Sequence, residues 1–231
     1  MPDDLGLKLL ELTSGGNALS LNELGTFPRF ALNEDLTALG GNGFLTLSDG
    51  YVTMNGNQRV LLAERLIHGG VDAKKVSRFL AWQEFEDFSE DILSENDFST
   101  RKHLVFKSTA GTREIDILAW NDTFTLAVDC KHWLRGLSSG RMKDAAKAQV
   151  ERATALAGRP ELLQRLKLPN LDGRTIMPVI LTLGELRDRV LNGVPIVSVS
   201  RLLSFIYGVS PIDATVSRIR VQDSSSQTRL A

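Results

Sequence analysis

The sequence predicts an α/β protein in which a mixed β-sheet flanked by helices follows a small α+β domain. Over residues 71–222, helical and β-prone segments alternate in the order α-β-β-β-α-β-β-α, which is typical of a mixed sheet with helices packed on it. Residues 1–70 instead hold short helical segments followed by a hairpin. Gly69-Gly70 is the expected hinge between the two domains, and residues 223–231 are expected to form a disordered tail.

Local patterns define the elements of the first domain. Leu5, Leu9 and Leu12 recur at helical spacing and predict a helix that stops at Ser14-Gly15-Gly16. Ser20 is a suitable N-cap for a short second helix. The remaining expected elements are a third helix opening at residues 33–36 and ending at 40–41, a hairpin of residues 44–48 and 51–54 joined by Asp49-Gly50, and a helix over 57–68.

Three helices followed by a hairpin are the layout of a winged helix, which often binds DNA. The third helix, however, carries Glu34 and Asp35 and has only Arg29 as a nearby cation. Helices that read the major groove need Lys or Arg for phosphates and guanines. Two interpretations therefore stay open: a DNA-binding domain, or a domain that packs against a partner or a second copy of the chain.

The second domain is expected to carry most of the structure. Its predicted elements are a helix over 76–96, strands over 103–107, 114–120 and 124–133, an alanine-rich helix over 139–157, buried strands over 175–183 and 194–199, and a closing helix over 201–207.

Composition excludes several classes of protein. No stretch approaches the ~18 consecutive apolar residues of a membrane span, so no membrane partner is expected. The N-terminus lacks the basic and apolar pattern of a secretory signal. Cys130 is the single cysteine, which excludes an intramolecular disulfide framework and a cysteine-rich zinc site. A cytoplasmic protein is the expectation.

The net charge of −1 conceals an uneven distribution. Residues 1–70 carry four basic and eight acidic side chains, whereas residues 131–167 carry nine basic and three acidic ones. Local positive charge can attract a polyanion even when the whole molecule is nearly neutral, although a charged stretch is also typical of a solvated helix face. The basic residues of this stretch are Lys131, Arg135, Arg141, Lys143, Lys147, Arg152, Arg159, Arg165 and Lys167.

Two neighbouring strands carry acidic side chains among apolar ones. Strand alternation places Asp116 on one face of the strand 114–120, and it places Asp129 and Lys131 on one face of the next strand. A two-residue turn at Asn121-Asp122 would put Asp116 opposite Ala127 and diagonal to Asp129, about 7–8 Å away between Cα atoms. All three charged side chains then project to the same side of the sheet.

Such a cluster has a chemical and a structural interpretation. Two close carboxylates repel unless a cation lies between them, and Mg²⁺ accepts one or two carboxylates plus water. A neighbouring lysine can act on a metal-bound water and offset negative charge that develops on a phosphate. The structural alternative is an ion pair between Asp129 and Lys131 on a solvated strand.

These residues resemble the core of the PD-(D/E)XK nuclease superfamily, also called restriction-endonuclease-like. The resemblance is carried by Ile115-Asp116, the hairpin that follows, and Asp129-Cys130-Lys131. The preceding helix, from Phe85-Glu86 to Phe98, is similar to that of the Mrr-like and archaeal Holliday-junction-resolvase-like branches. Position 115 holds isoleucine where the family pattern has proline, and Asp129 replaces the commoner glutamate.

The resemblance implies a metal site and a cofactor. Glu86, Asp116 and Asp129 would bind Mg²⁺ or Mn²⁺, the backbone carbonyl of Cys130 could also reach the metal, and Lys131 would be catalytic. Glu84, Asp87 and Glu90 lie on the same helix as Glu86, and Glu90 is one turn along from it, so the choice of acidic residue stays open there.

The function expected from residues and resemblance together is a metal-dependent DNA endonuclease that works as a homodimer. The residues expected to contact DNA are Arg135, Arg141, Lys143, Lys147 and Gln149. For Gln149 a merely solvent-facing position is the alternative. Two other functions stay open: a non-catalytic DNA-binding or scaffold protein on the nuclease fold, and a winged-helix transcription regulator.

Overall fold

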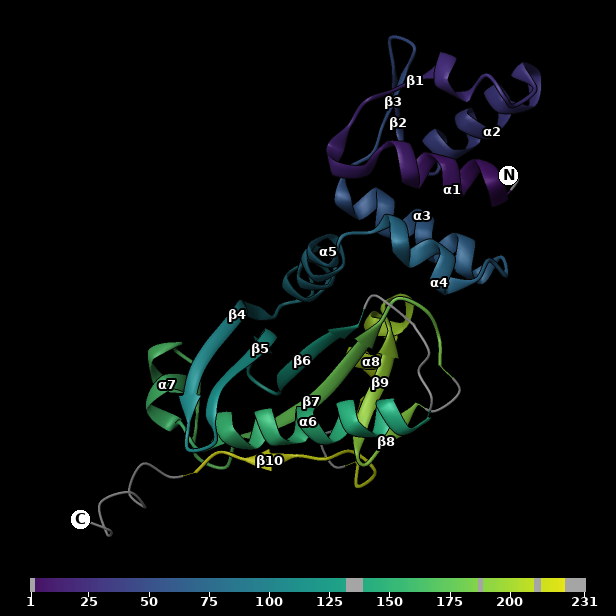
Figure 1. Cartoon of the computed structure of the whole chain (residues 1–231). Helices are drawn as coiled ribbons and strands as arrows, with labels where there is room; N and C mark the ends of the chain where they lie inside the picture. The colour runs from purple at the N-terminus through teal and green to yellow at the C-terminus, as the bar shows by residue number, and fades with distance from the viewer. Residues whose placement is uncertain (1–2, 132–138, 187–188, 210–212, 223–231) are drawn as a thin grey trace. The chain divides into compact units, whose positions relative to one another are not determined.

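A computed structural model describes residues 3–131, 139–186, 189–209 and 213–222 (Figure 1). Contacts between Cα atoms divide these residues into two compact units. The first comprises residues 3–88, and the second comprises the described residues from Ser89 onward. The expected tail at 223–231 lies outside the described residues.

The first unit combines helices with a small three-stranded antiparallel sheet in the order β1-β3-β2. Its elements are α1 (Asp3–Leu12), the 3-10 turn η1 (Ser14–Gly16), β1 (Leu19–Ser20), η2 (Leu21–Leu24), α2 (Arg29–Gly41), β2 (Thr46–Ser48), β3 (Tyr51–Thr53), α3 (Gly56–His68), α4 (Ala73–Val76) and η3 (Ser77–Phe79).

Capping and turn residues explain where these elements begin. Ser20 and Glu23 form a capping box at η2, which confirms Ser20 as an N-cap, although the element is a 3-10 turn. Asp49 and Gly50 adopt positive φ angles of 50° and 80°, as a tight two-residue hairpin requires. The third helix, α2, begins at Arg29 and not at residue 33; Pro28, with φ −58° and ψ 122°, is its N-cap residue and makes no side-chain cap hydrogen bond.

Arg59 is a fully buried charged residue at the centre of the first unit, with 1% of its surface exposed. Its guanidinium donates to Leu10 O and Thr13 Oγ1, both at 2.7 Å, and to Phe79 O. It also pairs with Glu84 Oε1 at 2.6 Å. These contacts join α1 and α3 to residues 79–84, which is why the first unit continues past Gly70 to Phe88.

The helix expected over residues 76–96 is interrupted, so that prediction is wrong in detail. Leu80 is extended, with φ −104° and ψ 135°, and separates η3 from α5 (Trp82–Ser94). Glu84 Oε2 accepts a hydrogen bond from Ala81 N at 2.8 Å, which satisfies a backbone donor at the start of α5. The carboxylate that opens α5 is thus the same one that pairs with Arg59.

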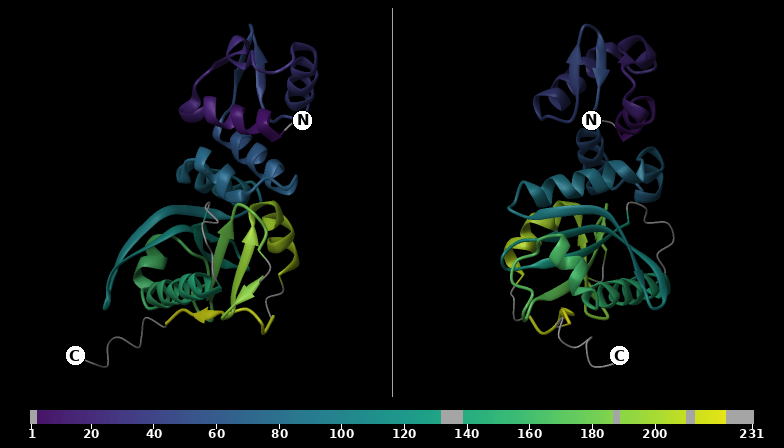
Figure 2. Two further views of the ribbon diagram at one scale, coloured as in Figure 1. Left: turned by 45° about the vertical axis from the view of Figure 1, so that its right-hand side comes forward. Right: turned by 90° about the vertical axis from the view of Figure 1, so that its left-hand side faces the viewer.

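The second unit is a mixed seven-stranded sheet flanked by helices, which confirms the predicted fold class (Figure 2). Its further elements are β4 (Ser99–Ser108), β5 (Gly111–Trp120), β6 (Thr125–Lys131), α6 (Ser139–Ala157), α7 (Pro160–Arg165), β7 (Thr175–Thr182), β8 (Val190–Leu191), β9 (Val194–Ser198), η4 (Val199–Arg201), α8 (Leu202–Gly208) and β10 (Ile219–Arg220). The sequence prediction missed α7 and the two-residue strands β8 and β10, which are too short to show periodicity.

The strands follow the order β4-β5-β6-β7-β9-β8. β4, β5 and β6 are antiparallel neighbours, whereas β6, β7 and β9 run parallel. One edge of β7 changes partner along its length: β10 pairs with residues 175–176 and β9 with residues 180–182. Pro178, which lacks a backbone N–H, lies between these two pairings.

Helix α6 lies along one face of the sheet (Figures 1 and 2). Small side chains allow the close approach, because Ala146 and Ala153 are fully buried. Met142 and Ala146 pack on Ile180, Val194 and Ile196. Towards its other end the helix packs Ala153, Leu156 and Ala157 against a second apolar cluster that includes Leu118 and Ala127. Burial of this continuous stripe fixes α6 over the centre of the sheet.

None of the helices in the described ranges is long and apolar enough to cross a membrane.

Arg59→Met is expected to lower the free energy of unfolding of the full-length chain by about 3 kcal/mol. The substitution leaves the Glu84 carboxylate, which is 19% exposed, without its cation, and two carbonyl groups and a hydroxyl without their donor. Urea denaturation followed by circular dichroism measures the change. Arg29→Met, at an exposed position of α2, is the matched control, and a loss below about 1 kcal/mol for Arg59→Met would contradict the role given to Arg59.

Candidate metal and phosphate site

The pairing of β5 with β6 decides which side chains meet. Trp120 pairs with Thr125 and Ile117 with Val128, so the connection contains four residues, 121–124. The predicted two-residue turn is therefore wrong. Continuing the observed register by one step places Asp116 directly opposite Asp129, and not opposite Ala127 as expected. In this register they are direct cross-strand neighbours, in place of the diagonal neighbours that the sequence predicted.

Asn121 and Arg174 hold the four-residue loop in place. Asn121 Oδ1 accepts hydrogen bonds from Thr123 N at 2.9 Å and Phe124 N at 2.8 Å. Arg174, 8% exposed, donates to Asn121 O at 3.0 Å and Asp122 O at 3.1 Å. Burial lowers the pKa of Arg174, and the nearby Asp122 opposes that shift. The side chain of Asn121 closes the loop by mimicking a backbone turn, a role that the sequence analysis did not assign to it.

Asp116 is half-buried on β5 and contacts the backbone of β6. Its Oδ2 accepts a hydrogen bond from Cys130 N at 2.8 Å. Burial raises the pKa of Asp116 above its usual value, and the negative charge of Asp129 adds to the increase. The Cys130 hydrogen bond and the positive charges of Lys131 and Arg152 act in the opposite direction. The surroundings of Asp116 therefore favour its neutral, protonated form more than water does.

Asp129 is 3% exposed and is contacted by two cations. Lys131 Nζ lies 2.7 Å from Asp129 Oδ2, and Arg152 Nη1 lies 2.8 Å from Asp129 Oδ1. The ion pair that the sequence analysis considered as a structural alternative is thus present. A buried carboxylate of this kind requires such partners, since an unpaired buried charge is strongly destabilising.

Arg152 is a site residue that the sequence analysis assigned only to the general basic stretch. Its Nη1 also donates to Gln149 Oε1 at 2.6 Å, and Gln149 Nε2 donates to Ala127 O at 2.7 Å. α6 is therefore connected to β6 by a chain of polar contacts that ends at Asp129. Helical spacing could have revealed that Gln149 is buried, because it shares one buried stripe of α6 with Met142, Ala146, Ala153 and Leu156.

The expected DNA contact of Gln149 is corrected by this geometry. Gln149 has no exposed surface, and its amide group is used within the protein. Three other expected DNA contacts, Arg141, Lys143 and Lys147, are exposed on α6. The fifth, Arg135, lies outside the described residues.

The acidic residues of α5 have different surroundings. Glu84 pairs with Arg59, and Glu90 accepts from Thr100 at 2.8 Å and pairs with Lys102 at 3.0 Å. Glu86, 6% exposed, belongs to the first unit, whereas Asp116, Asp129 and Lys131 belong to the second. The contribution of Glu86 to the site stays a prediction.

Glu114 has a partner on another strand, and a contribution of the Cys130 carbonyl to a metal site stays a prediction. Glu114 is exposed and its Oε1 lies 3.2 Å from His103 Nδ1 on the neighbouring strand β4. Cys130 alternates with Asp129 and Lys131 along β6, which turns its side chain to the other face of the sheet.

The site holds two carboxylates, and this decides which metal chemistry fits. Among the residues that the structure describes, no group of three or more His, Cys, Asp or Glu side chains is placed to hold a metal ion. Mg²⁺ nevertheless needs only one or two protein carboxylates, because water completes its coordination. Burial is the main cause of the raised pKa of Asp116, and the negative charge of Asp129 adds to it. A divalent cation near both groups would oppose both effects. Two carboxylates are a donor set of the kind that Mg²⁺ or Mn²⁺ accepts, and Lys131 and Arg152 already contact the two oxygens of Asp129.

Comparison with known proteins leaves the family of the chain undefined. No protein-family model matches it. An uncharacterized protein from Archaeoglobus fulgidus is 33% identical over 84 residues, which are 35% of this chain and 65% of that protein. The chain thus spans slightly less than two thirds of the length of this relative. A crystal structure of a protein of unknown function, AF1548, aligns with 52% of this chain and 58% of its own, with 14% identity and a TM-score of 0.34.

Asp116→Asn is expected to make the metal-free protein more resistant to urea at pH 7. Because the folded state raises the pKa of Asp116, ionising this group costs more in the folded than in the unfolded chain, and asparagine removes that cost while keeping an oxygen for Cys130 N. The advantage should shrink as the pH falls through the raised pKa of folded Asp116 and should be lost below 3.8, the ordinary value, where the carboxyl group is mostly protonated in both the folded and the unfolded chain. Urea midpoints measured with a chelator present, beside the exposed control Asp144→Asn, test this. An advantage that is equal at all pH values would contradict it.

Proposed function

We propose that this chain is a metal-dependent nuclease of the PD-(D/E)XK type that hydrolyses phosphodiester bonds in DNA. One observation carries the proposal: Asp116 and Asp129 lie one step beyond the last pair of the β5–β6 ladder, where the charge of Asp129 raises the pKa of Asp116, and Lys131 Nζ lies 2.7 Å from Asp129. A buried carboxylate beside a half-buried one is costly, and a binding site for a divalent cation is a reason for retaining the pair.

The side chains would divide the work among them. Asp116 and Asp129 would hold Mg²⁺ or Mn²⁺, which supplies Lewis-acid activation of the phosphate and of the attacking water. Lys131, 23% exposed at its side chain, offers its ammonium group to a phosphate oxygen and offsets the negative charge that develops there. Arg152 holds Asp129 Oδ1, so it fixes the orientation of that carboxylate.

The expected partners belong to the same proposal. Arg141, Lys143 and Lys147 are exposed on α6 and supply positive charge suited to a phosphate backbone, although Asp144 and Glu151 are exposed on the same helix. A homodimer would allow one site per chain to cut both strands of a duplex. The first unit would be a winged helix that docks DNA or a protein, and the location would be the cytoplasm.

A second candidate is a non-catalytic DNA-binding protein on the same fold. The observation that favours it is the double ion pair of Asp129, because both of its carboxylate oxygens already contact cations. A metal ion would compete with Lys131 and Arg152 for these oxygens. The two candidates differ in what the removal of Lys131 does, and this difference can be measured.

Lys131→Ala is expected to slow DNA cleavage by a factor on the order of 10²–10³, as for the loss of one stabiliser of developing negative charge. Its metal affinity should hold or rise, since a cation beside Asp129 is removed. Asp129→Asn should abolish both cleavage and metal binding. Single-turnover cleavage of linear, flapped, single-stranded and four-way-junction DNA with Mg²⁺ or Mn²⁺, together with calorimetry of metal binding, measures these effects.

The exposed variant Lys107→Ala is the matched control and should cleave at the wild-type rate. If Lys131 serves only as an ion-pair partner, Lys131→Ala costs ~0–1 kcal/mol of stability and leaves cleavage unchanged. That outcome, or wild-type protein that neither binds Mg²⁺ or Mn²⁺ nor cleaves any of these substrates, would reject the nuclease in favour of the non-catalytic candidate.

Arg141→Ala combined with Lys147→Ala is expected to weaken DNA binding regardless of sequence. If each side chain contacts one phosphate, the slope of log affinity against log salt should flatten by about two. Fluorescence anisotropy at several salt concentrations measures the slope. The matched control is the double variant Arg165→Ala with Lys167→Ala, which removes two exposed cations outside α6. It should keep the wild-type slope. Equal slopes for wild type and the α6 variant would make the basic face of α6 a solvated surface.

A further inference from the structure

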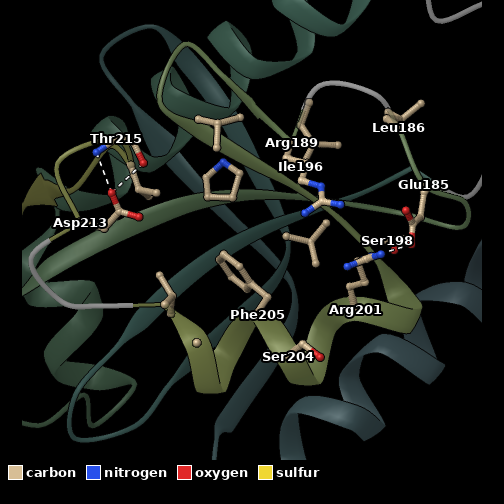
Figure 3. Close-up of a pocket in the computed structure, with 16 residues that line it drawn as sticks. Glu185, Leu186, Arg189, Ile196, Ser198, Arg201, Ser204, Phe205, Asp213 and Thr215 are labelled. Atoms are coloured by element: carbon tan, nitrogen blue, oxygen red, sulfur yellow. Dashed lines mark hydrogen bonds and ion pairs between the residues drawn. The ribbon is translucent and has the colours of Figure 1, made fainter.

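A pocket of about 350 Å³ lies in the second unit, in a part of the fold that the proposed nuclease site does not use (Figure 3). Its lining comes from residues 185–216, which include β9 and α8, and contains none of the residues of the carboxylate pair. The volume falls within the range of about 300–1,000 Å³ typical of sites for small molecules.

The walls of the pocket are mostly apolar. β9 contributes Ile196 and Val197, α8 contributes Phe205, and the segments beyond α8 contribute Val209 and Val216. Figure 3 places Phe205 and Ile196 on either side of the cavity. An aromatic ring and branched aliphatic side chains around a concave space favour the apolar body of a ligand, because its transfer from water is favourable.

Arg189 gives the pocket a positive group. Figure 3 shows its side chain reaching into the cavity, and within the described ranges its guanidinium makes no ion pair or side-chain hydrogen bond. The nearby Arg201 differs, because its Nε is already 2.5 Å from Glu185 Oε1. Of the two arginines, Arg189 is the one available for a ligand.

Asp213 lines another part of the pocket and is held in position. Its Oδ1 accepts hydrogen bonds from Thr215 N at 2.9 Å and Thr215 Oγ1 at 2.7 Å. Both hydrogen bonds lower the pKa of Asp213, and the bond from the Thr215 hydroxyl has the larger effect. An anionic group of a ligand would be repelled from Asp213, so it would bind beside Arg189.

We propose that this pocket binds a small organic anion with an aromatic or aliphatic body and one acidic group, which would pair with Arg189. A neutral apolar ligand would shield the Arg189 guanidinium from water without giving it a partner, which is unfavourable. An inorganic anion would leave the apolar walls unused. The combination of the two features therefore selects an amphipathic anion.

The test uses two fluorescent probes with the same aromatic body. 8-Anilinonaphthalene-1-sulfonate carries an anionic group, whereas N-phenyl-1-naphthylamine has none. The full-length protein should bind the anionic probe saturably with one site per chain and more tightly than the neutral probe. Arg189→Met should lower the affinity for the anionic probe about tenfold, as expected for the loss of a charge-assisted hydrogen bond. The affinity for the neutral probe should stay unchanged.

Two further variants connect binding to this pocket. Ser204 is an exposed residue of α8 that lines the cavity. Ser204→Phe should lower the affinity for both probes, because the larger side chain fills the cavity. Arg165→Met, an exposed arginine outside the pocket, should bind both probes as wild type does. Melting temperatures verify that all variants are folded. The proposal is overturned if the wild type binds the anionic probe without saturation, or if Arg189→Met binds it as tightly as the wild type.

Discussion

The register between β5 and β6 is the constraint on which the carboxylate site depends. A shift of two residues would move Asp116 away from Asp129 and give its carboxylate another backbone partner than Cys130. Asn121 closes the loop from within, and Arg174 binds the loop carbonyls from the start of β7. Asn121 follows Asp116 by five residues along the chain, and Arg174 contacts the carbonyl groups of the loop. The site is therefore positioned by residues that would never touch a ligand bound there.

Each unit uses one buried arginine to join segments distant in sequence. In the first unit Arg59 connects α1, α3 and the residues before α5, and in the second Arg174 connects the start of β7 to the β5–β6 loop. Their donors are satisfied largely by backbone carbonyls. Five donors in a rigid planar group suit arginine to this task, and lysine would satisfy fewer of these acceptors.

The sequence predicted much of the fold because long elements bury regular stripes. Helix α6 begins and ends where expected, since its alanine-rich face repeats over five turns, and β5, β6, β7 and β9 were placed to within a few residues. The break at Leu80 escaped prediction because it depends on Arg59, twenty residues earlier in the chain. Asp116, Asp129 and Lys131 were correctly placed on one face by alternation alone. Their cross-strand register was not, because it depends on the loop length, and the role of Arg152 depends on packing between α6 and β6.

Pro178 has a consequence for how the sheet assembles. Without a backbone N–H it is a poor place for a second neighbour, and it stands where β10 gives way to β9 along β7. The pairing of each of these two strands with β7 stops short of the proline, and extending it past Pro178 would add no hydrogen bond from the nitrogen of that residue. The missing N–H of Pro178 thus separates the two pairings along β7: β10 pairs with the part before the proline and β9 with the part after it, and each short strand keeps its own register.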